Sequence, residues 1–211
     1  MTDAVRLEEK MLVAITRPPK VGEIGDDEAI GASLAEPERF AEIFQRHWDE
    51  IYRYIAHRLG PDIAEDVGAD TFAVAFRSRR RYDPTREDAR PWLYGIATNL
   101  IRQHWRMERR RHRLLARADF EWSSESFDQT SDERLTAQRL APRIASALAR
   151  LSPAERDLLL LIAWADLTYE EVAQALDVPL GTVGSRLHRV RKKLRRTFGD
   201  INPLQLPEVD A

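Results

Sequence analysis

The sequence predicts an all-α protein built of two small helical domains joined by a flexible acidic linker. Apolar residues recur at steps of three and four residues over most of the chain, and no segment of any length alternates apolar and polar residues as a strand does. The 211 residues suffice for two small domains. An acidic, serine-rich stretch at 118–132 has no such period and separates the two helical halves.

The first domain is expected over residues 27–113, after a mobile tail at 1–26 that mixes charges with Pro and Gly. It should hold three helices, because three apolar-periodic segments are separated by turn-forming residues. The expected helices run from about Glu38 to Leu59, from Ile63 to Arg79 and from Pro91 onward.

The second domain is expected to begin at Glu133, after a linker at 114–132. Two sequences of the form Ser/Thr-x-x-Glu follow, a pattern that caps the first turn of a helix from both sides. The expected elements are a helix from Glu133 to Leu151 interrupted at Pro142, capped helices opening at Ser152 and Thr168, a last helix ending near Phe198, and a tail at 199–211.

The net charge of −2 hides two strongly basic blocks. Residues 77–113 carry a net charge of +8 and residues 180–196 a net charge of +7, whereas the rest of the chain is acidic. Two separated basic blocks indicate two contacts with a polyanion, and the acidic remainder limits indiscriminate binding. Each block could alternatively be a solvated helix face.

Residues 168–195 have the layout of a helix-turn-helix: a short capped helix, a turn, and a longer basic helix that in this motif enters the major groove. No acid lies within 180–196 to pair with the cations, which disfavours a merely solvated bundle helix. Arg can bond guanine bidentately, and Ser or Thr can reach base edges or phosphates. The candidate groove-reading residues are Thr182, Ser185, Arg186, Arg189 and Lys193.

The first basic block differs because its arginines alternate with aromatic and hydrogen-bonding residues. Such a track suits single-stranded or melted nucleic acid, whose bases stack on aromatic rings at about 1–3 kcal/mol each. Trp92 lies beside the apolar stripe and is expected in the core. The candidate contacts with melted DNA are Thr98, Asn99, Arg102, Trp105 and Arg106.

An enzyme is not expected. The sequence has no cysteine, no Gly-rich phosphate loop and no nucleophile elbow. Its five histidines are scattered without ligand spacing, so the acidic residues at 62–70 predict a docking or solvated face rather than a metal site. No cofactor is expected. The chain also lacks a signal pattern and a membrane-spanning apolar run, which makes a cytoplasmic protein the default expectation.

Three segments, Glu65–Phe72, Trp92–Asn99 and Leu167–Arg189, together resemble the bacterial RNA polymerase sigma factors of the extracytoplasmic-function (ECF) group. The resemblance covers roughly residues 27–113 and 132–198, in the family's order and spacing. It implies that the first domain docks on core RNA polymerase and opens the −10 promoter element. It also implies that the second domain reads the −35 duplex.

Carried over by position, the resemblance assigns three groups of residues. The docking face would hold Glu65, Asp66 and Asp70. Asn99 and the loop 82–90 would capture a flipped −10 base, with the melted-DNA candidates above beside them. The −35 readers would include Ser185, Arg186, His188 and Arg189. Because relatives are commonly held by an anti-sigma protein, such a protein is a candidate partner.

The chain departs from the family pattern at three places. Gly184 replaces a basic or polar residue, Gly68 and Ala69 stand where the docking helix carries larger residues, and His188 replaces an aromatic or aliphatic residue. The remaining alternative is a helix-turn-helix regulator that binds duplex DNA alone, with the first domain as a sensor or dimerisation module. The arginine- and aromatic-rich segment at 90–113 argues against that alternative.

Overall fold

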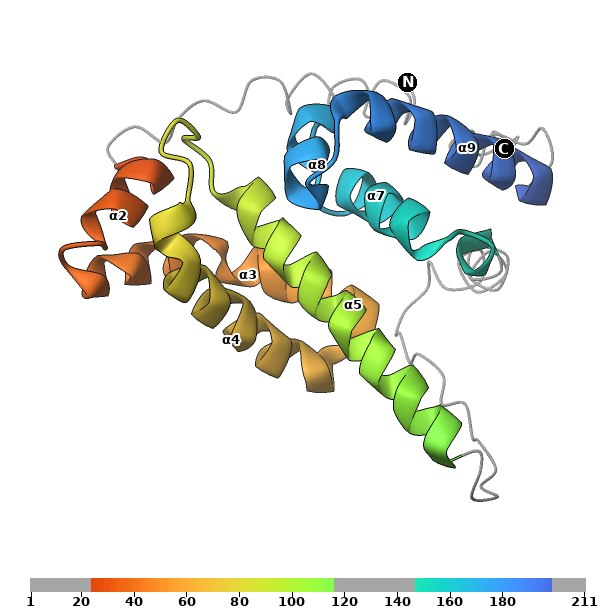
Figure 1. Ribbon diagram of the computed structural model, residues 1–211, viewed down its shortest axis with the longest axis horizontal. Helices are drawn as coiled ribbons and strands as arrows, with labels where there is room; N and C mark the ends of the chain where they lie inside the picture. The colour runs from red at the N-terminus through yellow and green to blue at the C-terminus, as the bar shows by residue number, and fades with distance from the viewer. Residues whose placement is uncertain (1–23, 116–146, 199–211) are drawn as a thin grey trace, which may run out of the picture.

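The computed structural model describes residues 24–115 and 147–198, and within these ranges the chain is helical without any strand (Figure 1). None of the described helices is long and apolar enough to cross a membrane. The first unit comprises α2 (Asp26–Ala32), η1 (Pro37–Phe40), α3 (Ala41–Leu59), α4 (Pro61–Ser78), η2 (Arg79–Arg81) and α5 (Arg90–Leu115). The second unit comprises α7 (Pro153–Ala163), α8 (Tyr169–Leu176) and α9 (Leu180–Phe198).

In the first unit α3 and α4 form a hairpin, and α5 packs against both helices. The chain turns between them at Gly60, whose φ of 85° is readily adopted only by glycine. Ile51 and Ile55 of α3 and Leu93 of α5 are fully buried at the centre of this packing. Trp92 is partly buried against the same core, as expected.

In the second unit both predicted capping boxes are present. The Ser152 hydroxyl accepts a hydrogen bond from the Glu155 backbone N–H, and the Glu155 carboxylate accepts one from Ser152 N–H. Thr168 and Glu171 make the same reciprocal pair at the start of α8. These caps satisfy helix-terminal N–H groups, so the two helices begin where the sequence predicts.

The sequence-based helix boundaries agree with the structure to within a few residues, with one exception. The sequence analysis identifies no helix between the tail and Glu38, whereas the structure has α2 over Asp26–Ala32. This short helix has no side-chain cap and is held by contacts with distant residues, including an ion pair between Asp26 and His47. The helical pattern expected at 133–146 and most of the predicted linker lie outside the described residues.

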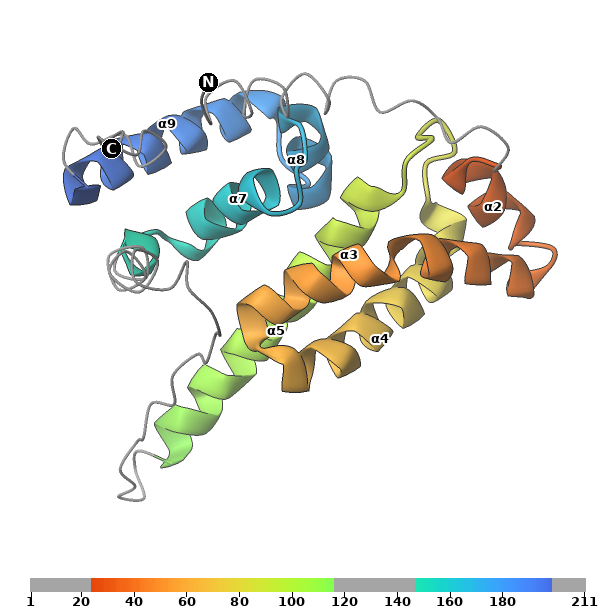
Figure 2. The ribbon, with the colours of Figure 1, turned by 180° about the vertical axis from the view of Figure 1, so that it is seen from behind.

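The two units pack on each other. α8 lies along the N-terminal part of α5, and the buried apolar residues of both units form one continuous cluster. Figures 1 and 2 show α7, α8 and α9 together on the side of α5 away from α4, whereas the C-terminal part of α5 projects past the other helices. The charge pattern alone does not indicate this contact.

Candidate nucleic-acid interface

The last helix, α9, buries one face and exposes the other. Val183, Leu187 and Val190 are buried, as the helix-turn-helix prediction requires. The Ser185 hydroxyl donates to Thr182 O at 3.1 Å, so it is oriented by its own helix. Of the groove-reading candidates, Ser185, His188 and Arg189 are exposed, and Thr182, Arg186 and Lys193 are partly buried.

Lys193 is tied to an acid of the same chain. Its Nζ donates to Glu155 Oε2 at 2.6 Å, and the same carboxylate oxygen accepts the capping hydrogen bond from Ser152 N. The hydrogen bond from Lys193, together with those from Ser152, lowers the pKa of Glu155 to about 2. Glu155 is therefore ionised at neutral pH and offsets part of the positive charge of α9.

Three of the melted-DNA candidates on α5 are accessible. Asn99, Trp105 and Arg106 are exposed, and the Trp105 side chain retains 45% of its accessible surface. An aromatic ring that remains this exposed on a basic helix can stack with an unpaired base.

The other two candidates on α5 are engaged inside the protein. The hydroxyl of Thr98 is buried and lies 2.9 Å from the Tyr54 hydroxyl. The Nε of Arg102 donates to Asp157 Oδ2 of α7 at 2.5 Å. As the two units are packed here, the Thr98 side chain is enclosed and Arg102 is paired with an acid, so neither is freely exposed, unlike Asn99, Trp105 and Arg106.

The loop at 82–90, which is expected to capture a base, is held in place by contacts within the loop and with the first residues of α5. The Tyr82 hydroxyl donates to Arg86 O at 2.5 Å, and the Tyr82 ring packs on Trp92 with 5.0 Å between ring centroids. At the end of the loop Asp88 Oδ1 accepts a hydrogen bond from Arg90 N at 2.8 Å, where α5 begins. These contacts fix the loop beside the N-terminal part of α5.

The predicted docking face lies on α4, where Glu65, Asp66 and Asp70 are all exposed. The structure gives a reason for the unusual Gly68 of this helix. A Cβ at Gly68 would lie 3.1 Å from ring atoms of Trp48, so glycine allows the indole to pack closely on α4. Ala69 is exposed, and nothing in the structure explains it.

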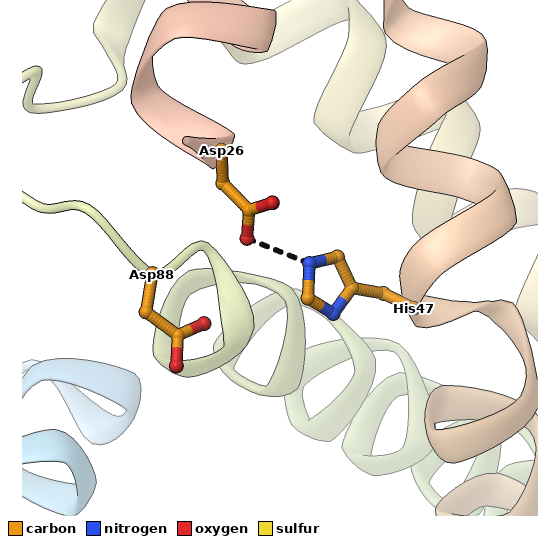
Figure 3. A group of neighbouring side chains, drawn as sticks. All are labelled: Asp26, His47 and Asp88. Atoms are coloured by element: carbon orange, nitrogen blue, oxygen red, sulfur yellow. Dashed lines mark hydrogen bonds and ion pairs between the residues drawn. The ribbon is translucent and has the colours of Figure 1, made fainter. Parts of the chain in front are cut away.

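A cluster of buried and partly buried ionisable groups that the sequence analysis did not identify lies where α2, α3 and the start of α5 meet. Figure 3 shows Asp26 facing the His47 ring, and one side-chain ligand atom each of Asp26, His47 and Asp88 lies within 4.8 Å of the other two. His47 Nε2 lies 2.7 Å from Asp26 Oδ2, and His47 Nδ1 lies 2.7 Å from Glu50 Oε1. Arg46 Nη1 donates to Asp26 Oδ1 at 3.0 Å.

The ionisable groups of this cluster form a charge network. Burial alone would lower the pKa of His47, but the hydrogen bonds and charges of Asp26 and Glu50 outweigh burial and raise it to about 9. Burial alone would raise the pKa of Asp26, but its bonds with His47, the Ala89 N–H and Arg46 lower it to about 2. A protonated imidazole bonded through both nitrogens has no lone pair for a metal ion.

Comparison with protein families matches both units. Residues 43–111 match the family model "Sigma-70 region 2", and residues 142–194 match "Sigma-70, region 4". The chain is 35% identical over 176 residues to the ECF RNA polymerase sigma factor SigE of Mycolicibacterium smegmatis, covering 80% of this chain but only 64% of that protein. It is 30% identical to RNA polymerase sigma factor NccH of Alcaligenes xylosoxydans, covering 80% of this chain and 92% of that protein.

Two solved structures share the fold. CnrH in complex with the cytosolic domain of CnrY aligns with a TM-score of 0.57 at 22% identity, over 82% of this chain and 96% of that chain. RpoE of Bartonella quintana in complex with the anti-sigma factor NepR aligns with a TM-score of 0.55 at 22% identity, over 76% of this chain and 97% of that chain. At this identity the two likenesses concern the fold alone.

Proposed function

The chain belongs to the sigma-70 family of RNA polymerase sigma factors, in its ECF group, and from that premise we propose that it binds core RNA polymerase, recognises −35 and −10 promoter elements, and opens the promoter. The observation that carries the proposal is the order and exposure of two basic helices. Most of α5 lies in the region-2 match, and most of α9 lies in the region-4 match. Each presents exposed cations and hydrogen-bonding groups.

In this proposal α9 enters the major groove of the −35 element. The exposed Arg189 and Ser185 contact base edges, and the exposed His188 lies beside them. The partly buried Arg186 and Thr182 add further contacts with the same groove. Lys193 contacts the phosphate backbone only when its ion pair with Glu155 opens.

The −10 element is proposed to be read on α5 as the strands part. Asn99 bonds an unstacked base, Trp105 offers a stacking surface, and Arg106 contacts the backbone. The braced loop at 82–90 forms the side of this site. Thr98 acts here through Tyr54, by fixing α5 on α3, rather than by contacting DNA itself.

Polymerase docking is assigned to the exposed acids of α4, Glu65, Asp66 and Asp70. Their common exposure on one helix supports a contact with a basic surface of core enzyme. The protein would perform no chemistry of its own and would act in the cytoplasm, where the polymerase is. An anti-sigma protein is proposed as a further partner, because the RpoE fold neighbour is in complex with one.

The proposal is tested by adding the purified chain to core RNA polymerase and sequencing the transcripts started in vitro on genomic fragments. Transcripts that begin at discrete promoters only when the chain is present support a sigma factor. A protein that shifts duplex DNA by itself but starts no transcript with core enzyme would instead be a helix-turn-helix regulator.

A further inference from the structure

The helix proposed to read the −10 element lacks the residues that usually stabilise the start of a helix. α5 begins at Arg90, so Ala89 occupies its N-cap position, and Ala89 O accepts the first helical hydrogen bond, from Leu93 N at 3.0 Å. Alanine has no side-chain acceptor for the free N–H groups of a first turn. The first turn of α5 also contains no acidic residue that could interact with the positive end of the helix dipole. The cap of α5 must therefore come from outside the helix.

Two carboxylates outside α5 supply this cap. Asp88, in the loop at 82–90, accepts a hydrogen bond from Arg90 N at 2.8 Å. Asp26 is the first residue of α2 and lies 63 residues before Ala89, and its Oδ2 accepts a hydrogen bond from Ala89 N at 3.0 Å. Asp26 and Ala89 are both buried, so the Ala89 N–H would lose its partner if the Asp26 carboxylate were removed.

The Asp26 carboxylate is in turn held in place by α3. The same oxygen that caps α5 lies 2.7 Å from His47 Nε2. Glu50, one turn further along α3, lies 2.7 Å from His47 Nδ1 and accepts a hydrogen bond from Arg90 Nε at 3.0 Å. Arg90 directly follows Ala89, so the contacts form a closed ring that runs through Ala89, Asp26, His47, Glu50 and Arg90.

This ring fixes the end of the loop at 82–90. The beginning of the loop is held separately by Tyr82, whose hydroxyl donates to Arg86 O and whose ring packs on Trp92. Asp88 and Ala89 are the last residues before α5, so the ring determines where the loop ends and the helix begins. The exposed part of the loop lies between these two fixed points and comprises Asp83, Pro84, Thr85 and Glu87.

We propose that Asp26 is a positioning residue for the −10 site: by capping α5 from α2, it holds the loop at 82–90 and the start of α5 in the geometry that captures an unpaired base. This inference rests on the proposed function. Asp26 is buried and does not contact DNA itself. It acts through Ala89 and the loop, because a site that is already ordered loses less conformational entropy when the base binds.

Asp26→Ala removes the cap. Asp26→Asn is the conservative variant, because its amide oxygen can still accept the hydrogen bond from Ala89 N but carries no charge for His47. Ala64→Gly is the matched control, because Ala64 is buried near the start of α4 and glycine destabilises a helix interior. The turn between α3 and α4 lies at the end of the hairpin away from α2 (Figure 2), so this control leaves the cap intact. Urea unfolding verifies that every variant is folded under the assay conditions.

Amide hydrogen exchange of the free full-length chain tests the cap. In Asp26→Ala the amides of residues 86–93 should exchange about tenfold faster than in the parent, because the loop end and the first turn of α5 open more often. Asp26→Asn should give a smaller increase, and Ala64→Gly should leave exchange at 86–93 as in the parent. Unchanged exchange at 86–93 in Asp26→Ala would refute the cap.

The positioning role is tested with core RNA polymerase on a promoter located by transcript sequencing. Asp26→Ala should open the duplex promoter about tenfold more slowly than Ala64→Gly, as measured by permanganate reactivity, because the base-capturing loop is no longer held in place. Asp26→Asn should recover part of this loss, and a template mismatched at the −10 element should remove it. Binding to core enzyme and to the −35 duplex should be the same in Asp26→Ala and Ala64→Gly.

Equal opening rates for Asp26→Ala and Ala64→Gly would overturn the positioning role, because Asp26 would then contribute to stability alone. A different outcome separates this inference from the proposed function. If the parent chain starts no transcript with core enzyme, the proposed function fails and the positioning role fails with it, whereas faster exchange at 86–93 in Asp26→Ala would still establish the cap.

Discussion

Lys193 on α9 and Glu155 at the first turn of α7 form an ion pair of 2.6 Å that joins the candidate DNA-reading helix to the helix before it. The same glutamate caps α7, so one carboxylate both starts a helix and neutralises a cation of the basic face. The positive charge that the sequence places on α9 is therefore not all available to DNA. In the sequence Lys193 resembles the other cations of α9. Only the structure shows that Lys193 is paired with an acid.

Arg189→Ala should weaken binding to the −35 duplex by about 1–3 kcal/mol, and Arg186→Ala by a similar amount, because a bidentate contact with guanine is lost. Lys193→Ala should cost less than either change, since Glu155 already offsets this cation. Fluorescence anisotropy with −35 and scrambled duplexes gives the three values. Equal losses for Lys193→Ala and Arg189→Ala would show that the Glu155 pair does not persist on DNA.

Glu155→Gln should retain the helix cap through its side-chain oxygen but remove the negative charge beside Lys193. We expect the slope of log affinity against log salt to steepen by about one counterion, with a similar change on specific and non-specific duplexes. Titrations at several salt concentrations measure the slope. Glu171→Gln, which alters the corresponding cap of α8, is the matched control and should leave the slope unaffected.

Asn99→Ala should impair promoter opening without weakening polymerase binding, because the side chain is exposed on α5 and is proposed to hold a flipped base. Permanganate footprinting on duplex templates should show reduced reactivity at the −10 element. A template already mismatched there should restore transcription. If Asn99→Ala opened duplex promoters like the parent chain, the role assigned to Asn99 would be wrong.

The folded protein should lose stability as the pH rises from 6.5 toward 9. The pKa of His47 is raised from 6.5 to about 9 in the folded state, so its ion pairs stabilise fully below pH 6.5 and are lost as the pH passes 9. The shift corresponds to about 3 kcal/mol. His47→Gln should remove this contribution, and urea unfolding at pH 6, 7.5 and 9 measures it. The exposed His188→Gln is the control and should retain the slope.

Low pH should also weaken the charge network around His47, because it protonates Asp26. The pKa of Asp26 is lowered from 3.8 to about 2, so its contribution is present above pH 3.8 and disappears as the pH falls through 2. Asp26→Asn should therefore be less stable than the parent at pH 6 and nearly equal to it below pH 2. Unfolding monitored by circular dichroism at both pH values tests this. An unchanged stability of Asp26→Asn at pH 6 would show that α2 does not depend on this pair.

The helices could be predicted because their signals are local. The boxes at Ser152 and Thr168, the stop at Gly60 and the apolar period of each segment act within one or two turns. α2 could not be predicted in this way. Its seven residues are too few to form a stable helix alone, and it depends on Asp26 meeting His47, twenty-one residues away.

The sequence could predict which residue types form the candidate site, but only partly which of their side chains are exposed. The periodicity of α9 correctly separates the buried Val183 and Val190 from the exposed Ser185 and Arg189. On α5 the same reasoning does not distinguish Thr98, which is buried, from Asn99, which is exposed. The difference arises because α8 and Tyr54 cover one side of α5, and a local pattern does not record which distant element will do so.

The sequence by itself determined the helical class, most helix ends, the two basic blocks and the family resemblance, because periodicity, caps and charge depend on neighbours along the chain. The tertiary structure alone decided which cations remain available. Arg102 meets Asp157 across fifty-five residues and Lys193 meets Glu155 across thirty-eight. Such pairs form only when packing brings their helices together, since the strength of a charge contact depends on distance and burial rather than on sequence separation.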